Sequence, residues 1–353
     1  MYIHKNFTGG NIFVENQTEN HVYLKNELRD TDCNWFYWAF CVEGAEGKTV
    51  TFHFQENRLG YYGPAVSHDL KKWHWLDKVE ENAFTYKFGE SESKVYFAHD
   101  MLYHPERFME FARLKGLCVQ EFCKSDKGRS IPAVSIGEGE RSIILTARHH
   151  ACESTGSYVL EGVLDELMNN MLPDTKVLCV PFVDYDGVVD GDQGKNRIPH
   201  DHNRDYDKTS KSIYASTAAI REYAEKNGCH YGFDFHSPWH IGGENDHIFI
   251  VQNLFEKTNR FYEFGKLFES EITGNSLKYY QKNDYPFMTG WNMKNTNFTI
   301  FMSERKENEL AFSLETTYFG TKDNKVSQEK LIELGKCFAK TLKLYINRFE
   351  GKI

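Results

Sequence analysis

The sequence lacks features that would indicate a membrane or nucleic-acid-binding protein. No stretch approaches the roughly 18 apolar residues that span a bilayer, and the N-terminus has no long apolar run behind its single basic residue. Positive charge is not in excess, because 42 Lys and Arg stand against 51 Asp and Glu, a net charge of -9. Such a charge opposes binding to a phosphate backbone or an anionic membrane. We therefore expect a cytoplasmic protein that binds neither.

The eight cysteines lack the Cys-x-x-Cys spacing typical of zinc-binding and redox motifs. A chain of 353 residues is long enough to bury a core without disulfides, so we expect reduced thiols. Any metal must then be held by histidine and carboxylate side chains. Aromatic residues, by contrast, make up 15% of the chain, which excludes a disordered or low-complexity protein.

The chain changes character near residue 105. Before it, short aromatic and β-branched runs alternate with turn residues, a pattern typical of an antiparallel β-sandwich; the runs are Asn34–Val42, Lys48–Phe54, Ala83–Phe88 and Lys94–Ala98. After it, helical and strand patterns alternate. We therefore predict a β-sandwich domain over residues 1–105 and an α/β domain with a mixed sheet over residues 106–353.

Short continuous apolar runs in the second part suit strands that are buried on both faces: Ser142–Ala147, Lys176–Val183, Tyr231–Phe235, Ile248–Val251 and Leu310–Leu314. The helix pattern recurs at Ser154–Met171, Ser212–Asn227, Leu254–Thr273 and Ser327–Phe349. A further apolar segment, Asn297–Met302, resembles a strand.

Potential metal ligands stand where these buried strands end. His150 follows one strand closely and Glu153 opens the next helix, so imidazole and carboxylate could face one Zn²⁺. His236 follows another buried strand, as a third ligand would require, and Glu315 follows a third strand. Reactive groups collect at the carboxyl ends of strands in α/β sheets, so we expect these four side chains to lie close together.

A long loop between the ligand candidates carries three cationic residues, Lys195, Arg197 and Arg204. Arginine offers a planar fork of donors that matches a carboxylate, so this loop suits a substrate with a free carboxylate. His149, His200 and His202 are candidates for extra ligands or for side chains that orient a neighbouring ligand.

In order and content these segments resemble the M14 family of zinc metallocarboxypeptidases, in particular its cytosolic carboxypeptidase-like branch. His150-Ala-Cys-Glu153 is similar to the His-x-x-Glu zinc motif of the family, and Asn203-Arg204 to its substrate-carboxylate pair. His236 stands where the family has its third ligand, and Glu315 where it has its catalytic glutamate. The aromatic run Trp35–Trp38 is similar to the β-sandwich domain that precedes the catalytic domain in that branch.

The resemblance implies a carboxypeptidase with one Zn²⁺ per chain, held by His150, Glu153 and His236. Water on the metal would be the nucleophile and Glu315 the general base. Asn203 and Arg204 would hold the terminal carboxylate of a peptide or peptide-like substrate.

Two further roles of the family match this sequence less directly. The oxyanion arginine of the family falls on Gly194 by its spacing, so the role is assigned to Arg197, with Lys195 as the rival. Tyr285 is the nearest counterpart of the active-site tyrosine by position. The segment Asn297–Met302 stands where the family places side-chain selectivity, and it predicts an apolar base for the substrate pocket.

Two other functions fit the same residues. One is a zinc amidase or deacylase that acts on an acyl-amino acid, as in aspartoacylase-like relatives of the fold. The other is a peptide-binding protein without catalysis, although such a protein has no physical reason to keep three ligands together with Glu315. The sequence leaves open which C-terminal residue is removed, whether the substrate is linear, branched or derived from a cell wall, and the oligomeric state.

Overall fold

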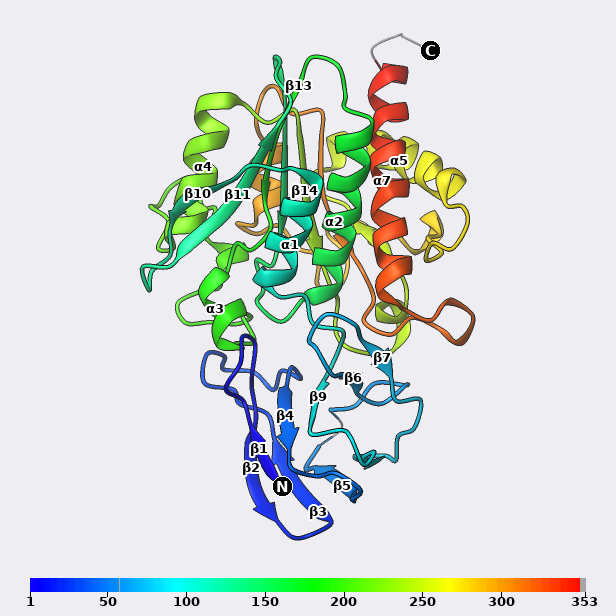
Figure 1. Cartoon of the computed structure of the whole chain (residues 1–353). Coiled ribbons are helices and arrows are strands. Elements are labelled where there is room, and N and C mark those ends of the chain that lie inside the picture. Colours follow the sequence, from blue (N-terminus) through cyan, green and yellow to red (C-terminus); the bar gives the residue numbers. More distant parts are fainter. Residues whose placement is uncertain (57, 350–353) are drawn as a thin grey trace.

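The computed structural model describes residues 1–56 and 58–349. Its largest sheet has seven strands in the order β10-β11-β13-β12-β14-β16-β15 (Figure 1). These strands are β10 Val119–Lys124, β11 Ser130–Ile136, β12 Arg141–Ala147, β13 Thr175–Val180, β14 Tyr231–His236, β15 Phe249–Val251 and β16 Leu310–Glu315. Strands β13, β12, β14 and β16 run parallel, and the remaining pairs are antiparallel. The predicted α/β class with a mixed sheet is confirmed.

The apolar runs form these strands because both faces of the sheet are covered. Ile143 and Leu145 of β12 belong to one hydrophobic core, and Ile144 between them belongs to another. Alternate residues of a strand point to opposite faces, so a continuous apolar run serves both cores.

Seven α-helices are described: α1 Pro105–Lys115, α2 Ser154–Asn169, α3 Tyr185–Asp190, α4 Ala215–Asn227, α5 Thr258–Glu271, α6 Phe298–Ser303 and α7 Gln328–Phe349. Apolar side chains of α2, α5 and α7 pack on one face of the sheet, and those of α4 and α6 on the other. No described helix is long and apolar enough to span a membrane.

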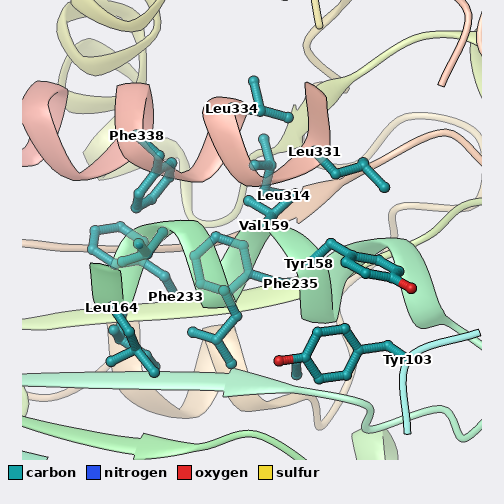
Figure 2. Close-up of a cluster of buried hydrophobic side chains, with 14 of the residues drawn as sticks. Tyr103, Tyr158, Val159, Leu164, Phe233, Phe235, Leu314, Leu331, Leu334 and Phe338 are labelled. Atoms are coloured by element: carbon teal, nitrogen blue, oxygen red, sulfur yellow. The ribbon is translucent and has the colours of Figure 1, made fainter. Parts of the chain in front are cut away.

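Helices α2 and α7 lie side by side, and their side chains cover β14 and β16 (Figure 2). Glycine makes this close approach possible. A Cβ atom at Gly162 would lie 1.9 Å from the carbonyl oxygen of Ile332, and one at Gly335 would lie 2.0 Å from that of Val159. The apolar side chains of α7 therefore face the core, to which Leu331, Leu334 and Phe338 contribute.

The segment Asn297–Met302 is not a strand, and that prediction is wrong. It forms α6, for which Asn297 is the N-cap residue, because the Asn297 Oδ1 atom accepts a hydrogen bond of 2.8 Å from the Ile300 amide. Residues 298–303 are all buried, and Phe298, Phe301 and Met302 belong to the core on this face of the sheet.

The first hundred residues form two further sheets. One joins β1 Tyr2–His4, β4 Ala39–Glu43, β9 Lys94–Ala98, β6 Ala65–Ser67 and β7 His74–Trp75, and the other joins β2 Phe13–Gln17, β3 His21–Lys25, β5 Thr49–Phe54 and β8 Ala83–Lys87. Phe52 from one sheet contacts Phe40 and Phe97 from the other, with ring centroids 5.4 Å apart in both pairs. On this basis we propose a sandwich domain over residues 1–105, followed by the α/β domain over residues 106–353.

Candidate active site

The first two candidate ligands are held by the turn between β12 and α2. Arg148 follows β12 in a left-handed conformation, with a φ of 62°. Its guanidinium donates hydrogen bonds to the carbonyl oxygens of Ala151 and Tyr103, at 2.9 and 3.0 Å. Glu153 is the N-cap residue of α2. The turn is thus fixed by buried contacts, and it directs both His150 and Glu153 to the carboxyl ends of the parallel strands.

His150, Glu153 and His236 meet in one buried group. The Nδ1 atom of His150 lies 3.0 Å from Glu153 Oε1, and the Nδ1 atom of His236 lies 2.7 Å from Glu153 Oε2. One candidate ligand atom from each residue lies within 4.8 Å of the other two. All three residues are at most 6% exposed. The structure brings together the three side chains that the sequence indicated as metal ligands.

Each histidine of this group also faces an aspartate. The Nε2 atom of His150 lies 3.7 Å from Asp201 Oδ1, and the Nε2 atom of His236 contacts Asp234 Oδ2. His149 contacts the other Asp234 oxygen through Nδ1, at 2.8 Å, which gives it the orienting position that was one of its candidate roles. A carboxylate on the far side of a histidine fixes the tautomer and orientation of the ring and makes it a stronger ligand.

The charges of the group depend on one another. Burial raises the pKa of Glu153, but Lys195 and the two histidines lower it by more, so it lies well below its ordinary value. Burial lowers the pKa of His236, but Asp234 and Glu153 raise it well above the ordinary value of histidine. A cation is therefore favoured between these acidic groups, and a bound metal would take the place of the proton.

Glu315 lies beside this group. His236 and Glu315 are register partners at the carboxyl ends of β14 and β16. Burial raises the pKa of Glu315, and the charge of Glu153 adds to that rise. Its Oε2 atom is buried and has no hydrogen-bond partner among the described residues. A carboxylate in these surroundings is poised to take up a proton.

Asn203 and Arg204 lie in the short helix η1, His202–Arg204. Both line a cavity that His150, His236 and Glu315 also line. The Nδ2 atom of Asn203 lies 3.2 Å from His236 Nε2, and its Oδ1 atom accepts a hydrogen bond of 3.2 Å from the Phe298 amide. The Arg204 side chain is exposed and donates one hydrogen bond to the carbonyl oxygen of Asn203. Its remaining donors can reach a carboxylate in the cavity.

Arg197, the first choice for the oxyanion cation, is engaged elsewhere. Its guanidinium lies 3.1 Å from Asp30, 2.7 Å from Asp184 and 3.0 Å from Asp192. The ammonium of Lys195 instead lies 2.7 Å from Glu153 Oε1, next to the candidate ligands. The structure therefore favours the rival, Lys195, because three carboxylates hold Arg197 away from the group.

The cavity around these residues has a volume of about 610 Å³. Tyr285 is not among its lining residues; it stacks on Trp291, which does line the cavity, with ring centroids 4.7 Å apart. The segment 297–302 does not supply the predicted apolar base, since only Asn297 of it lines the cavity. The run Phe298–Met302 is buried in the protein interior instead.

Sequence reasoning missed several residues of the site. Asp234 could have been found, because it stands two residues before His236 on the same face of β14. Asp201, Trp35 and Trp239 carry no such signal. Trp35 and Trp239 line the cavity from segments that are far apart in the chain.

No family model matches the chain. In sequence it is similar to an uncharacterized protein of Zymomonas mobilis, at 26% identity over 272 residues, which cover 71% of this chain and 70% of that protein. Cytosolic carboxypeptidase 3 of Mus musculus is 22% identical over 304 residues, which cover 78% of this chain and 29% of the mouse protein. Among solved structures, the metallo-carboxypeptidase of Burkholderia cenocepacia matches with a TM-score of 0.81 at 17% identity, covering 99% of each chain.

The chain has the metallo-carboxypeptidase fold, and the cytosolic carboxypeptidases are among its relatives in sequence. This confirms the resemblance on which the sequence analysis relied. The matched region of this metallo-carboxypeptidase-like chain spans less than a third of the mouse carboxypeptidase. The activity and substrates of such relatives therefore come to this chain as proposals.

Proposed function

We propose that the chain is a zinc-dependent metallocarboxypeptidase that hydrolyses the C-terminal amide bond of a peptide. One observation carries the proposal. Two imidazoles and a carboxylate meet in a buried group beside the unpartnered Glu315 carboxylate, and a cavity with Arg204 at its edge opens onto them.

The chemistry of the donor set fits zinc. Catalytic zinc is commonly held by three protein ligands of the His and Glu types, with a fourth position open. The aspartates behind His150 and His236 add the carboxylate–histidine arrangement typical of such sites. When bound there, Zn²⁺ would polarise the scissile carbonyl and lower the pKa of bound water to about 7.

The other residues take their roles from their positions. Glu315 accepts a proton from the attacking water and passes it to the departing amine, for which its raised pKa suits it. Asn203 and Arg204 hold the terminal carboxylate of the substrate. Lys195, which lies next to Glu153, faces the negative charge that develops on the carbonyl oxygen.

The walls near Arg204 indicate which side chain the departing residue carries. Asn295 and Asn297 line the cavity on either side of Thr296, whose hydroxyl bonds to Arg204, and Asn292 and Ser313 line it as well. From residue 238 to residue 315 the described lining residues include no Lys or Arg. We therefore propose a neutral side chain that can form hydrogen bonds, rather than an acidic one.

Elemental analysis of the purified protein, combined with a peptide library that varies the C-terminal residue, tests the function. We expect about one zinc per chain, in line with a single three-ligand site, and release of a neutral polar residue. The double variant His150→Ala, His236→Ala should lose both zinc and turnover. His68→Ala, which alters an exposed histidine on the N-terminal part, is the matched control and should change neither. Zinc that stays near one per chain in the double variant would show that the ligands lie elsewhere.

The same assay separates the two other functions. Hydrolysis of acyl-amino acids without hydrolysis of peptides would identify a deacylase. Binding of peptides without any hydrolysis by the zinc-loaded protein would identify a binding protein. A cytoplasmic location and the lack of nucleic-acid binding stay predictions from composition.

A further inference from the structure

One end of the cavity is aromatic. Trp35, from the N-terminal part, and Trp239, just after β14, both line the cavity, with ring centroids 5.0 Å apart. The ammonium of Lys195 lies 4.6 Å from the centroid of the Trp35 ring and 2.7 Å from Glu153 Oε1. A single side chain, that of Lys195, thus bridges the aromatic pair and the candidate metal ligands.

A separate part of the lining forms the polar end of the cavity. Arg204 lies there beside the segment 291–297, because the Thr296 hydroxyl donates a hydrogen bond of 2.7 Å to the carbonyl oxygen of Arg204. If Arg204 holds the terminal carboxylate, as the proposed function requires, the departing residue occupies this polar end and the scissile bond lies at the metal ligands. The residue before the scissile bond then lies beyond those ligands, and Trp35 is its candidate neighbour because Lys195 connects Glu153 with the Trp35 ring.

Hydrogen bonds between distant segments hold Trp35 in place. Its Nε1 atom donates a hydrogen bond of 2.9 Å to Asn196 Oδ1, and its carbonyl oxygen accepts one of 2.7 Å from Asn26. The Asp30 carboxylate accepts hydrogen bonds from the amides of Gln193 and Gly194, at 3.0 and 2.8 Å. The N-terminal segment 26–35 and the loop that carries Lys195 are therefore fastened to each other.

Trp239 is supported from behind but open toward the cavity. Phe36 packs edge-on against it at 5.2 Å and stacks on His240 at 4.7 Å. Trp239 is nevertheless 43% exposed. A large aromatic surface that is held in place and only half covered gains from a partner that removes it from water.

We propose that Trp35 and Trp239 form a substrate subsite for an aromatic side chain at the residue that precedes the scissile bond. A ring fits there because aromatic pairs favour offset or edge-to-face contacts with indole rings. An acidic side chain is disfavoured by Asp32 and Glu244, which also line the cavity. A basic one is disfavoured by Lys195, which already occupies a face of Trp35. This assignment depends on the proposed function only for the direction of the peptide.

Equilibrium binding to the zinc-loaded Glu315→Gln protein tests the subsite without turnover. The probes are four peptides, N-acetyl-Ala-Ala-Xaa-Gln, in which Xaa is Phe, Ala, Asp or Lys. We expect the Phe peptide to bind about tenfold more tightly than the Asp and Lys peptides, as the burial of one aromatic ring allows. Adding Trp35→Ala or Trp239→Ala should remove this preference and leave binding of the Ala peptide nearly unchanged.

Trp291→Ala, added to the same protein, is the matched control. It removes an exposed tryptophan at the polar end, so it can alter the affinities for all four peptides. The ratio of the affinity for the Phe peptide to that for the Asp peptide should stay the same. Equal binding of the four peptides, no binding of any of them, or a ratio that survives Trp35→Ala would overturn the subsite. Turnover of the Phe peptide by protein with Glu315 intact is a separate readout and tests the proposed function alone.

Discussion

The two halves of the candidate site are built in different ways. His150, Glu153, His236 and Glu315 stand at or just beyond the carboxyl ends of parallel strands, where the register of the sheet sets their positions. Lys195, by contrast, lies in an irregular loop, which leads into the short helix η1 with Arg204.

The loop half depends on partners from distant segments. The Asp30 carboxylate accepts hydrogen bonds from two backbone amides of this loop. The Gln193 side chain, from the same loop, donates a hydrogen bond of 2.9 Å to the carbonyl oxygen of Tyr37. The ends of the parallel strands therefore place the metal ligands, whereas the loop that carries Lys195 is held by the N-terminal part. The predictions below change one half at a time.

The largest effect on turnover is expected at the strand-end half. Glu315→Gln keeps the size of the side chain but removes the proton acceptor, so turnover should fall by about 10²-fold to 10⁴-fold. Zinc content and peptide affinity should stay, because neither requires the Glu315 charge. Single-turnover kinetics and elemental analysis measure the two effects. Lost zinc would make Glu315 a ligand, and near-normal turnover would mean that the base is another residue.

A somewhat smaller effect on turnover is expected in the loop half. Substituting Lys195 and Arg197 one at a time shows which of the two cations acts in catalysis. Lys195→Ala should lower kcat by roughly 10²-fold to 10³-fold, as the loss of a group that stabilises the oxyanion does. Arg197→Ala should instead destabilise the fold by roughly 3–5 kcal/mol, since it leaves buried carboxylates without their partner. Urea unfolding and the kcat of the folded fraction distinguish these outcomes. The reverse pattern would restore Arg197 to the oxyanion role.

Substitution of Asp234, the aspartate that contacts His236, should have an intermediate effect that is confined to zinc affinity. Asp234→Asn removes the charge that both His149 and His236 face, and zinc affinity should fall by roughly 10-fold to 100-fold. Competition with a zinc chelator measures the affinity. The control is Asp207→Asn, which alters a half-buried aspartate that hydrogen-bonds within its own turn. Unchanged zinc affinity in Asp234→Asn would limit the role of this residue to folding.

The smallest effect on activity is expected at Asp284, which does not line the cavity. Burial raises the pKa of this carboxyl to about 7, although Ile250 and Tyr279 donate hydrogen bonds to it. A raised pKa means that the folded state holds the proton more tightly than the unfolded state. Stability from this group is therefore full below about pH 4 and is lost as the pH rises to about 7.

Asp284→Asn should remove that contribution to the pH dependence, which amounts to at most about 4 kcal/mol. The free energy of unfolding in urea at pH 4.5 and 7.5, compared with that of the unmodified protein, measures the difference. Activity at pH 7.5 should stay nearly constant. An identical pH dependence in the two proteins would contradict the raised pKa.

Much of the fold could be predicted because its signals are local. The buried strands carry continuous apolar runs, and the helices α2, α4, α5 and α7 lie where the sequence pattern placed them, with ends that differ by a few residues. The failure at Asn297–Met302 has a local cause as well. An apolar run of six residues fits a strand or a buried helix equally well, and only the N-cap hydrogen bond of Asn297 indicates the helix.

The candidate ligands could be predicted because their positions follow from the strands that precede them. The spacing of His150 and Glu153 and the strand ends at His236 and Glu315 are written in the sequence. The roles of Arg197 and Lys195 could not be predicted in this way, since the two cations stand only two residues apart in one loop. Their partners, Asp30, Asp184 and Asp192 for one and Glu153 for the other, become neighbours only in the folded chain.

By itself, the sequence determined the α/β architecture and the kind of metal site, because apolar periodicity and strand ends are short-range properties of the chain. Only the tertiary structure decided which cation faces the ligands and which surfaces the substrate meets. Those choices depend on contacts between residues that are distant in the chain, such as Lys195 with Glu153 and Trp35 with Asn196 and Trp239. Such contacts leave no pattern in any one stretch of sequence, because the role of each residue depends on where its partner lies in the folded chain.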